Sequence, residues 1–321
     1  MKNRIGLNLE LYKKVYLIRR TEEKIREYYL ENEMKTPVHL SIGEEAIAAG
    51  VCQALSIEDQ IFGTYRNHGI YLARTGETDK FFAELYGKQT GAARGKAGSM
   101  HISAPESNFL GSSAVVASII PVAVGASFVN KRKNNRKLVA VFFGDGALDE
   151  GSFWESLNFA CLKELPVMFV CEDNGLAIHS PISDRQGYGC IDDIVSRFHC
   201  NVLKEETTDP EAIYRLTCDA VHLVKNNHKP CFLHLKYYRY LEHVGINQDF
   251  EFGYRSKEEF ERWYKMDPVN LQRKKLEENG YPEEVIQQLE KQINKQIDDS
   301  IELAKKAPFP DESELFEDVY V

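Results

Sequence analysis

The middle of the chain alternates short apolar runs with a stretch of helical spacing. Residues 138–143, 166–171 and 231–235 are apolar runs, a pattern typical of buried parallel strands. Between the first two runs, the apolar residues of 151–165 recur at intervals of three and four, as on one face of a helix. This alternation predicts an α/β fold, a doubly wound and mostly parallel sheet with helices on both faces.

Both ends of the chain are predicted to be helical. Residues from about 9 to 33 carry apolar side chains at helical spacing between charges, and residues 44–55 form a second predicted helix. Residues 83–113 are rich in Gly, Ala and Ser and poor in β-branched residues, so we expect an ordered but irregular loop region there. From about 256 to 310 the chain is charged and helical. Because no repeat or low-complexity linker interrupts it, we expect one domain over 1–321 with a helical C-terminal extension.

Composition and charge narrow the class of protein. Lys and Arg number 40 against 49 Asp and Glu, and the net charge of −9 argues against nucleic acid as the main partner. The most apolar long run, 114–129, is shorter than the roughly 20 residues that cross a bilayer, so we expect it in the protein core and predict no membrane partner. The N-terminus lacks a signal-peptide core, and the seven dispersed cysteines show no CxxC pair. We therefore expect a cytoplasmic protein with reduced thiols.

Polar residues follow two of the predicted strands. Asp145 lies between Gly144 and Gly146 after the first strand, and Asn174 lies just beyond the second. Neighbouring strands are only ~5 Å apart, so both side chains come within reach of one ion. A carboxylate, an amide oxygen and a nearby backbone carbonyl suit Mg²⁺. The glycines leave room for a phosphate, and the N-terminus of a helix that begins near Glu150 favours an anion. The predicted site is a divalent metal that holds a diphosphate.

Other phosphate-binding motifs do not match this stretch. The dinucleotide motif GxGxxG requires glycine where the chain has Asp149, and the P-loop requires GK[ST], whereas the chain has GKQ at 87–89 and GKA at 95–97. Two unrelated solvent-exposed turns remain an alternative for either half of the metal motif taken alone.

The combination of motifs resembles a known family. GDG followed by FxESLNFAxLxxLPVxFVCEDN is similar to the thiamine diphosphate motif in the alpha subunit of the decarboxylating (first) component of 2-oxo acid dehydrogenase complexes, of the pyruvate, branched-chain and acetoin types. GDG with a terminal Asn is also shared by transketolases and decarboxylases, so the specificity comes from the other stretches. These follow the family's order from about residue 10 to 270: PVHLSIGEEA at 37–46, TYRNHG at 64–69, GKAGSMH at 95–101, NFLGSSAVVASIIPVAVGA at 108–126 and YYRYLEHVG at 237–245.

The resemblance implies that thiamine diphosphate and Mg²⁺ are the cofactors. Asp145 and Asn174 would ligate the metal together with the carbonyl oxygen of Leu176. Val116 would be the apolar fulcrum that bends the cofactor, and the backbone of Ala114 would contact its pyrimidine ring. The remaining cofactor-binding residues implied by the resemblance are Tyr65, Arg66, Gly144, Gly146, Ala147 and His243.

The resemblance also implies roles for histidines. His243 matches the active-site histidine and His39 a second histidine near the substrate channel; a histidine with a pKa near neutrality could donate or shuttle protons there. His68 and His101 are expected to order loops by hydrogen bonds. Without the resemblance, Tyr65 and Arg66 would be neighbouring residues at the edge of the sheet with an ordinary ion partner, and His243 would be a residue of a surface loop.

A separate beta subunit supplies the activating glutamate in this family, and 321 residues leave room for the diphosphate-binding half only. We therefore expect an α2β2 assembly with the cofactor at subunit interfaces and a small 2-oxo acid as substrate. A lipoyl-bearing acyltransferase is the further partner implied. The loop after His243 departs from the family, with Val244-Gly-Ile-Asn-Gln-Asp in place of Ser and a Ser-Asp segment, so regulation and lipoyl transfer are not carried over at this loop. EDNGLAIHSP replaces the usual NNxYAIS, and residues 200–210 lack the usual Val-Asp-Gly-Asn.

The leading functional prediction is oxidative decarboxylation of a 2-oxo acid, together with a beta subunit. An alternative is a thiamine diphosphate-dependent acyl or aldehyde transferase that forms C–C bonds in a sugar or natural-product pathway, for which the altered loop leaves room. A third hypothesis is that the chain is a degenerate regulatory subunit. It is opposed by the presence of four predicted site residues: Asp145, Asn174, Arg66 and His243.

Overall fold

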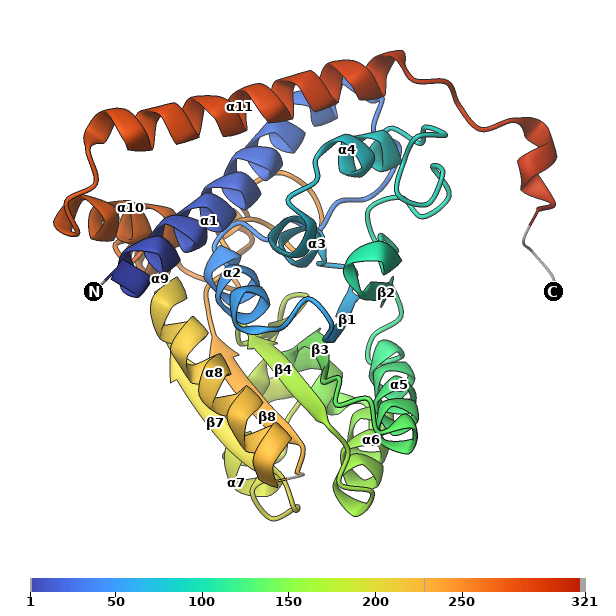
Figure 1. The fold of residues 1–321 in the computed structure, drawn as a ribbon, viewed down its shortest axis with the longest axis vertical. Helices are drawn as coiled ribbons and strands as arrows, with labels where there is room; N and C mark the ends of the chain where they lie inside the picture. Colours follow the sequence, from blue (N-terminus) through green and yellow to red (C-terminus); the bar gives the residue numbers. More distant parts are fainter. Residues whose placement is uncertain (1, 228, 318–321) are drawn as a thin grey trace.

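A parallel sheet of six strands forms the centre of the molecule (Figure 1). The computed structural model describes residues 2–227 and 229–317. Its strands are β1 (Gln60–Thr64), β2 (Phe109–Ser113), β3 (Val139–Gly144), β4 (Val167–Asp173), β7 (Asn201–Glu206) and β8 (Cys231–Lys236). They lie in the order β2–β1–β3–β4–β8–β7, and each neighbouring pair is parallel.

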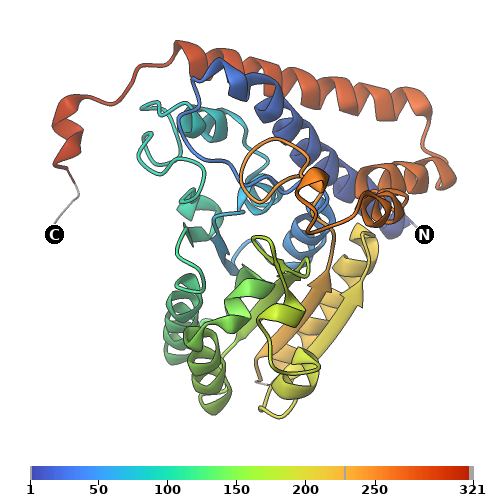
Figure 2. The ribbon, with the colours of Figure 1, turned by 180° about the vertical axis from the view of Figure 1, so that it is seen from behind.

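Helices cover both faces of this sheet, which confirms the predicted fold class. Because successive side chains of a strand point to opposite faces, Ala140 and Phe142 belong to one apolar core while Val141 and Phe143 belong to another. The first core is completed by α1 (Lys2–Tyr28), α2 (Glu45–Ala54), α3 (His68–Thr75), α4 (Asp79–Leu85) and α8 (Pro210–Asn227). The second is completed by α5 (Ile119–Lys133), α6 (Gly151–Leu162) and α7 (Ile191–Val195), and Figure 2 shows this side.

The C-terminal part is helical, as predicted. It contains α9 (Lys257–Tyr264), α10 (Pro268–Glu278) and α11 (Glu283–Lys306). Both ribbon views show the long α11 lying across α1 and α4 (Figures 1 and 2). Thr78 and Ser300 share a hydrogen bond of 2.7 Å, and Arg20 Nε donates to Asn294 Oδ1 at 3.0 Å. These contacts join the end of the chain to its beginning.

Short elements connect the main ones. They are η1 (Tyr29–Glu31), η2 (Pro105–Ser107), η3 (Asp145–Asp149), η4 (Ile182–Asp184), η5 (Phe250–Phe252), η6 (Glu312–Leu315) and the two-stranded hairpin of β5 (Leu176–Ala177) and β6 (Ser180–Pro181). The region 83–113 is irregular over much of its length, but it ends in the edge strand β2, which its small residues did not predict.

The expectation that 114–129 is buried core is wrong for part of that run. Val115 is 67% exposed and Val122 is 54% exposed, whereas Ile120 and Ala123 are fully buried. The run enters α5, and a surface helix packs only one face on the sheet. The apolar residues of its other face are therefore left uncovered in this chain. Within the described ranges, no helix combines the length and apolar character that crossing a bilayer requires.

Candidate active site

The carboxyl ends of β1, β3, β4 and β8 border a cavity of about 270 Å³. From β1 the chain leads to β2 on one side, and from β3 it leads to β4 on the other, so the cavity lies where the strand order reverses. This is the usual position of ligand sites in open parallel sheets. The cavity is lined by Glu44, Thr64, Tyr65, Arg66, Val116, Ala117, Gly144, Asp145, Gly146, Ala147, Asp149, Glu150, Glu172, Asn174, Leu176, Ala177, Ile178, Tyr237 and His243.

Most of the residues predicted to bind the cofactor line this one cavity. Ala114 does not line it; this residue directly follows β2 and is partly exposed. His39 lies next to the cavity wall, with its ring centroid 4.5 Å from that of Tyr65 and 5.2 Å from that of His243. Residues that follow β1, β3 and β4 are thus brought together with His39, Val116 and His243, although their functional roles stay predictions.

Asp145 is buried at the end of β3, only 1% exposed. One of its carboxylate oxygens, Oδ2, forms an ion pair with Arg185, which also contacts Asp149 at 2.6 Å. The other oxygen, Oδ1, is buried and has no hydrogen-bond partner. Burial and the neighbouring Asp173 raise the pKa of Asp145 to about 6, while Arg185 opposes them. A buried carboxylate oxygen without a partner is the kind of atom that a bound cation would satisfy.

Asn174 and Leu176 lie on a tight turn beside Asp145. Gly144 pairs with Glu172 across β3 and β4, which places the two strand ends side by side. Asn174 Nδ2 donates to the Tyr237 hydroxyl at 2.9 Å, and Asn174 Oδ1 accepts from the backbone N–H of Leu176 at 3.0 Å. Gly175 has a φ of +77°, which a glycine adopts without strain.

The predicted oxygen ligands therefore fit a magnesium ion in chemistry. One carboxylate, one amide oxygen and one carbonyl form a hard donor set. No group of three or more His, Cys, Asp and Glu side chains suited to a metal occurs in the described part of the chain. The predicted magnesium site contains one carboxylate and two other oxygen ligands, so the absence of such a group neither supports nor contradicts it. The magnesium site stays a prediction.

Arg66 supplies a buried cation at the base of the cavity. Its Nη1 donates to the carbonyl oxygen of Leu40 at 2.6 Å and its Nη2 to that of His243 at 3.0 Å. The Glu44 carboxylate is 4.0 Å from Nε, but burial raises the pKa of Glu44 to about 7, so its negative charge is incomplete at neutral pH. Burial also raises the pKa of Glu172 well above its usual value. Arg66 is therefore only partly neutralised, which favours an anionic ligand in this cavity.

His39 and His243 do not titrate near neutrality in this chain, contrary to the sequence expectation. Burial, and then the positive charge of Arg66, lowers the pKa of each ring to about 3. Both imidazoles are consequently neutral at pH 7. Arg239 Nη1 lies 3.3 Å from Nδ1 of His243. Because a guanidinium can only donate, Nδ1 is the acceptor and the ring proton is on Nε2.

His68 and His101, which were expected to order loops by hydrogen bonds, take part in loop contacts. His68 Nε2 lies 2.7 Å from Ser99 Oγ and connects α3 to the loop before β2. His101 Nδ1 lies 3.3 Å from the carbonyl oxygen of Ser112.

Several residues that line the cavity or contact its lining carry no signal in the sequence. Tyr237 lies within YYRYLEHVG, where no pattern marks it, although its hydroxyl accepts from Asn174. Arg185 lies 40 positions from Asp145 in a loop with no recognisable spacing. Glu44 and Glu172 belong to GEEA at 43–46 and CEDN at 171–174, but no pattern indicates that their carboxyls face one cavity.

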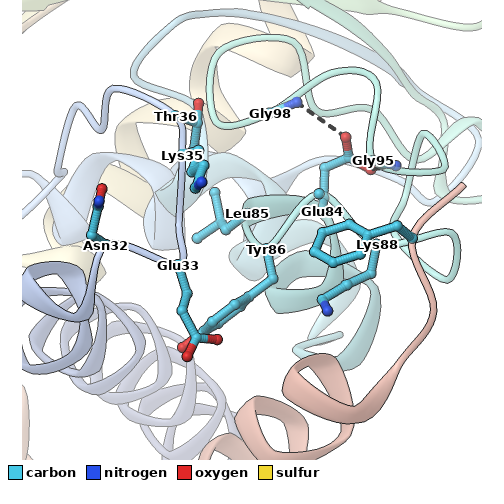
Figure 3. A pocket seen from close by; sticks show the side chains of 12 residues that line it. Asn32, Glu33, Lys35, Thr36, Glu84, Leu85, Tyr86, Lys88, Gly95 and Gly98 are labelled. Carbon is cyan, nitrogen blue, oxygen red and sulfur yellow. Dashed lines mark hydrogen bonds between the residues drawn. The ribbon is translucent and has the colours of Figure 1, made fainter.

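A cavity of about 460 Å³ lies elsewhere, between the segment 32–36, the loop after α4 and Phe309 (Figure 3). None of the predicted site residues lines it. Its Glu84 is fully engaged, because this carboxylate accepts from four backbone N–H groups, including that of Gly98 at 3.0 Å. Both carboxylate oxygens of Glu84 therefore have partners, unlike those of Asp145 at the sheet edge.

The comparisons with known proteins all indicate the same protein family. The model of the dehydrogenase E1 component family matches residues 13–313. The chain is 31% identical over 318 residues to the alpha subunit of acetoin:2,6-dichlorophenolindophenol oxidoreductase of Bacillus subtilis (strain 168), covering 98% of this chain and 93% of the relative. It is 32% identical over 315 residues to the pyruvate dehydrogenase E1 component subunit alpha of Zymomonas mobilis, covering 98% and 88%. The mitochondrial pyruvate dehydrogenase E1 subunit alpha-1 of rice is 33% identical over 324 residues, covering 98% and 80%. The chain therefore belongs to the dehydrogenase E1 component family, the thiamine diphosphate-dependent oxidoreductases that its motifs resemble.

Proposed function

We propose that this chain is the alpha subunit of a 2-oxo acid dehydrogenase and that it binds magnesium and the diphosphate of thiamine diphosphate in the cavity at the sheet edge. The observation that carries the proposal is the buried, unpartnered Oδ1 of Asp145, next to Asn174 and within the same cavity as Arg66. The metal would be held by Asp145, Asn174 and the carbonyl of Leu176. The phosphates would be held by Arg66, Tyr65 and the backbone of Gly146 and Ala147.

The residues of this chain have distinct roles in the proposed reaction. When bound, thiamine diphosphate supplies the nucleophilic carbon and the electron sink that decarboxylation of a 2-oxo acid requires. Arg66 contributes a fixed positive charge whose guanidinium is oriented by two backbone carbonyls. Neutral His243 offers its Nε2–H as a donor to an oxygen on which negative charge develops. His39 lies beside it as a second neutral imidazole.

A beta subunit is the proposed partner, in an α2β2 assembly. The support is the uncovered apolar side of the segment that borders the cavity: Val116 lines the cavity, and Val115 and Val122 are exposed. Monomeric proteins rarely leave such side chains clustered in contact with water. We propose that the beta subunit covers this surface and brings its activating glutamate to the cofactor. We further propose that a lipoyl-bearing acyltransferase is a second partner of this chain and that the chain is located in the cytoplasm.

The test is an assay of this chain co-expressed with a beta-type subunit of the same organism. A panel of 2-oxo acids and acetoin would be supplied with thiamine diphosphate, Mg²⁺ and ferricyanide or 2,6-dichlorophenolindophenol as electron acceptor; the relative from Bacillus subtilis is named for that dye. We expect turnover that needs both subunits and is lost in Asp145→Ala. Asp184→Ala is the matched control, because Asp184 is exposed at the end of η4, directly before Arg185.

Two outcomes would redirect the assignment. If the assembly binds the cofactor but no 2-oxo acid reduces the acceptor, the acyl or aldehyde transferase function takes first place, and carboligation products should then be sought. If neither the chain nor the assembly binds thiamine diphosphate, the proposed metal and diphosphate site is wrong.

A further inference from the structure

His234 is held between two carboxylates behind the proposed metal site. It lies in β8 and is buried, with Nε2 2.8 Å from Asp173 Oδ2 and Nδ1 2.8 Å from Asp192 Oδ1. Asp192, at the start of α7, is also 3.3 Å from Lys204 Nζ of β7. A line of alternating charges therefore runs from β7 through α7 and β8 to the last residue of β4.

The end of this line supports the turn that carries Asn174. The second oxygen of Asp173, Oδ1, accepts from the backbone N–H of Gly175 at 2.8 Å. Asp173 and Asn174 face different cavities: Asp173 lines one of about 450 Å³ together with His234 and Asp192, whereas Asn174 lines the proposed cofactor cavity. The orientation of Asn174 thus depends on a carboxylate that never faces the cofactor cavity.

Two acceptors on one ring require two donors. An imidazole satisfies both carboxylates only when both nitrogens carry protons, and the hydrogen bond to Asp173 together with the charge of Asp192 raises the pKa of His234 despite its burial. In its protonated form His234 donates to both carboxylates, and its charge together with that of Lys204 balances their two negative charges. The hydrogen bond to Asp173 fixes the rotamer of that side chain. A neutral imidazole has one N–H and leaves either Asp173 Oδ2 or Asp192 Oδ1 without its donor from the ring.

We propose that His234 is a positioning residue for the metal site: clamped between Asp192 and Asp173, it holds the Asn174–Leu176 turn in the conformation that binds the divalent cation. The inference rests on the proposed function, because it assumes that Asn174 and Leu176 are metal ligands. Groups that orient metal ligands from outside typically account for about 10- to 100-fold in metal affinity.

The experiment measures Mn²⁺ binding to the assembled alpha and beta subunits in the presence of thiamine diphosphate, with free Mn²⁺ followed by electron paramagnetic resonance. His234→Gln is expected to weaken Mn²⁺ binding by about 10- to 100-fold. Asp192→Asn, which alters only the outer contact, is expected to weaken it less. His222→Gln on the exposed side of α8 is the matched control and should bind as the wild type does. Thermal unfolding of each protein shows whether the folded state itself is affected.

The outcomes separate this inference from the proposed function. If the wild-type assembly binds Mn²⁺ and both His234→Gln and Asp192→Asn bind it with the same affinity, the positioning role is overturned. The proposed metal site is kept in that case. Failure of the wild-type assembly to bind Mn²⁺ contradicts the proposed function instead. If His234→Gln does not fold, Asp192→Asn decides, because it retains the imidazole and its contact with Asp173.

Discussion

Nδ1 of His243 lies 3.3 Å from the guanidinium of Arg239, a fully buried residue whose Nε also donates to the carbonyl oxygen of Leu241. Arg239 is itself held near Asp249, which is ion-paired with Arg255. The loop after His243, which departs from the family pattern, is therefore anchored at Asp249. Its anchoring fixes which nitrogen of His243 can donate to a substrate.

This relationship predicts different effects for two substitutions of His243. Asparagine can keep an acceptor near the position of Nδ1 but has no group at Nε2, so His243→Asn should lower kcat by about 10²- to 10⁴-fold, the usual contribution of a proton donor. Glutamine can place an amide donor near Nε2, so His243→Gln should lose less. The dye-reduction assay at saturating cofactor measures both. Equal activity of His243→Asn and the wild type would remove His243 from the reaction.

Arg66→Lys should impair cofactor binding and stability together. A lysine ammonium cannot reproduce the planar fork that serves Leu40 and His243 at once, and a buried carbonyl left without a donor costs about 1–3 kcal/mol. We expect the dissociation constant for thiamine diphosphate to rise at least about tenfold. Isothermal titration of the assembly gives the binding constant, and denaturant unfolding gives the stability. Lys274→Arg, the reverse exchange at an exposed lysine of α10, should change neither by a comparable amount.

Glu22 should make the folded state less stable as the pH rises. Its side chain is fully buried, with Oε1 accepting from the N–H of Ser41 at 2.8 Å and Oε2 unpartnered, and burial raises its pKa from 4.5 to about 8. Between these values the folded state binds more protons than the unfolded state, so the free energy of unfolding falls with increasing pH across this window.

Glu22→Gln should flatten that dependence, because glutamine keeps the acceptor for Ser41 and does not ionise. At pH 8 we expect the variant to be more stable than the wild type, by an amount on the order of a few kcal/mol, since each pKa unit corresponds to ~1.4 kcal/mol. Urea unfolding at pH 5 and pH 8 provides the comparison. Parallel pH profiles for the two proteins would show that Glu22 is ionised in the folded state already at low pH.

Val122→Asp should weaken assembly without unfolding the chain. Val122 is exposed on the uncovered face of α5, where a charge meets water in the free subunit but an apolar surface in the proposed complex. The dissociation constant for the beta subunit should rise at least about tenfold, while the stability of the alpha chain changes by no more than ~0.5 kcal/mol. Val285→Asp, at an exposed position of α11, is the control. Equal binding of both variants would place the beta subunit elsewhere.

Periodicity predicted the central elements because the physics behind it is local. The runs 138–143, 166–171 and 231–235, which form β3, β4 and β8, are buried on both faces and are apolar except for His234. The helix between β3 and β4 has one apolar side. From this alternation alone, Asp145 and Asn174 could be placed at adjacent strand ends, and the register of Gly144 with Glu172 confirms that adjacency.

Features that depend on distant partners were not visible in the pattern. The strand β7 is at the sheet edge and carries polar residues, so it lacks an apolar run. The neutral state of His243 follows from burial beside Arg66, 177 positions away in the chain. Arg185 reaches Asp145 from a loop without a periodic signal. In each case the deciding contact forms only after the chain has folded.

The position of α11 has a consequence for the order of folding. Tyr12 of α1 donates to Glu290 of α11 across 278 positions, and Lys24 is 3.1 Å from Asp298. During synthesis the sheet and its flanking helices emerge from the ribosome long before these partners do. Part of the surface of α1 therefore stays uncovered until α11 has been translated. We expect the amides of α1 to be among the last in the protein to gain protection from hydrogen exchange.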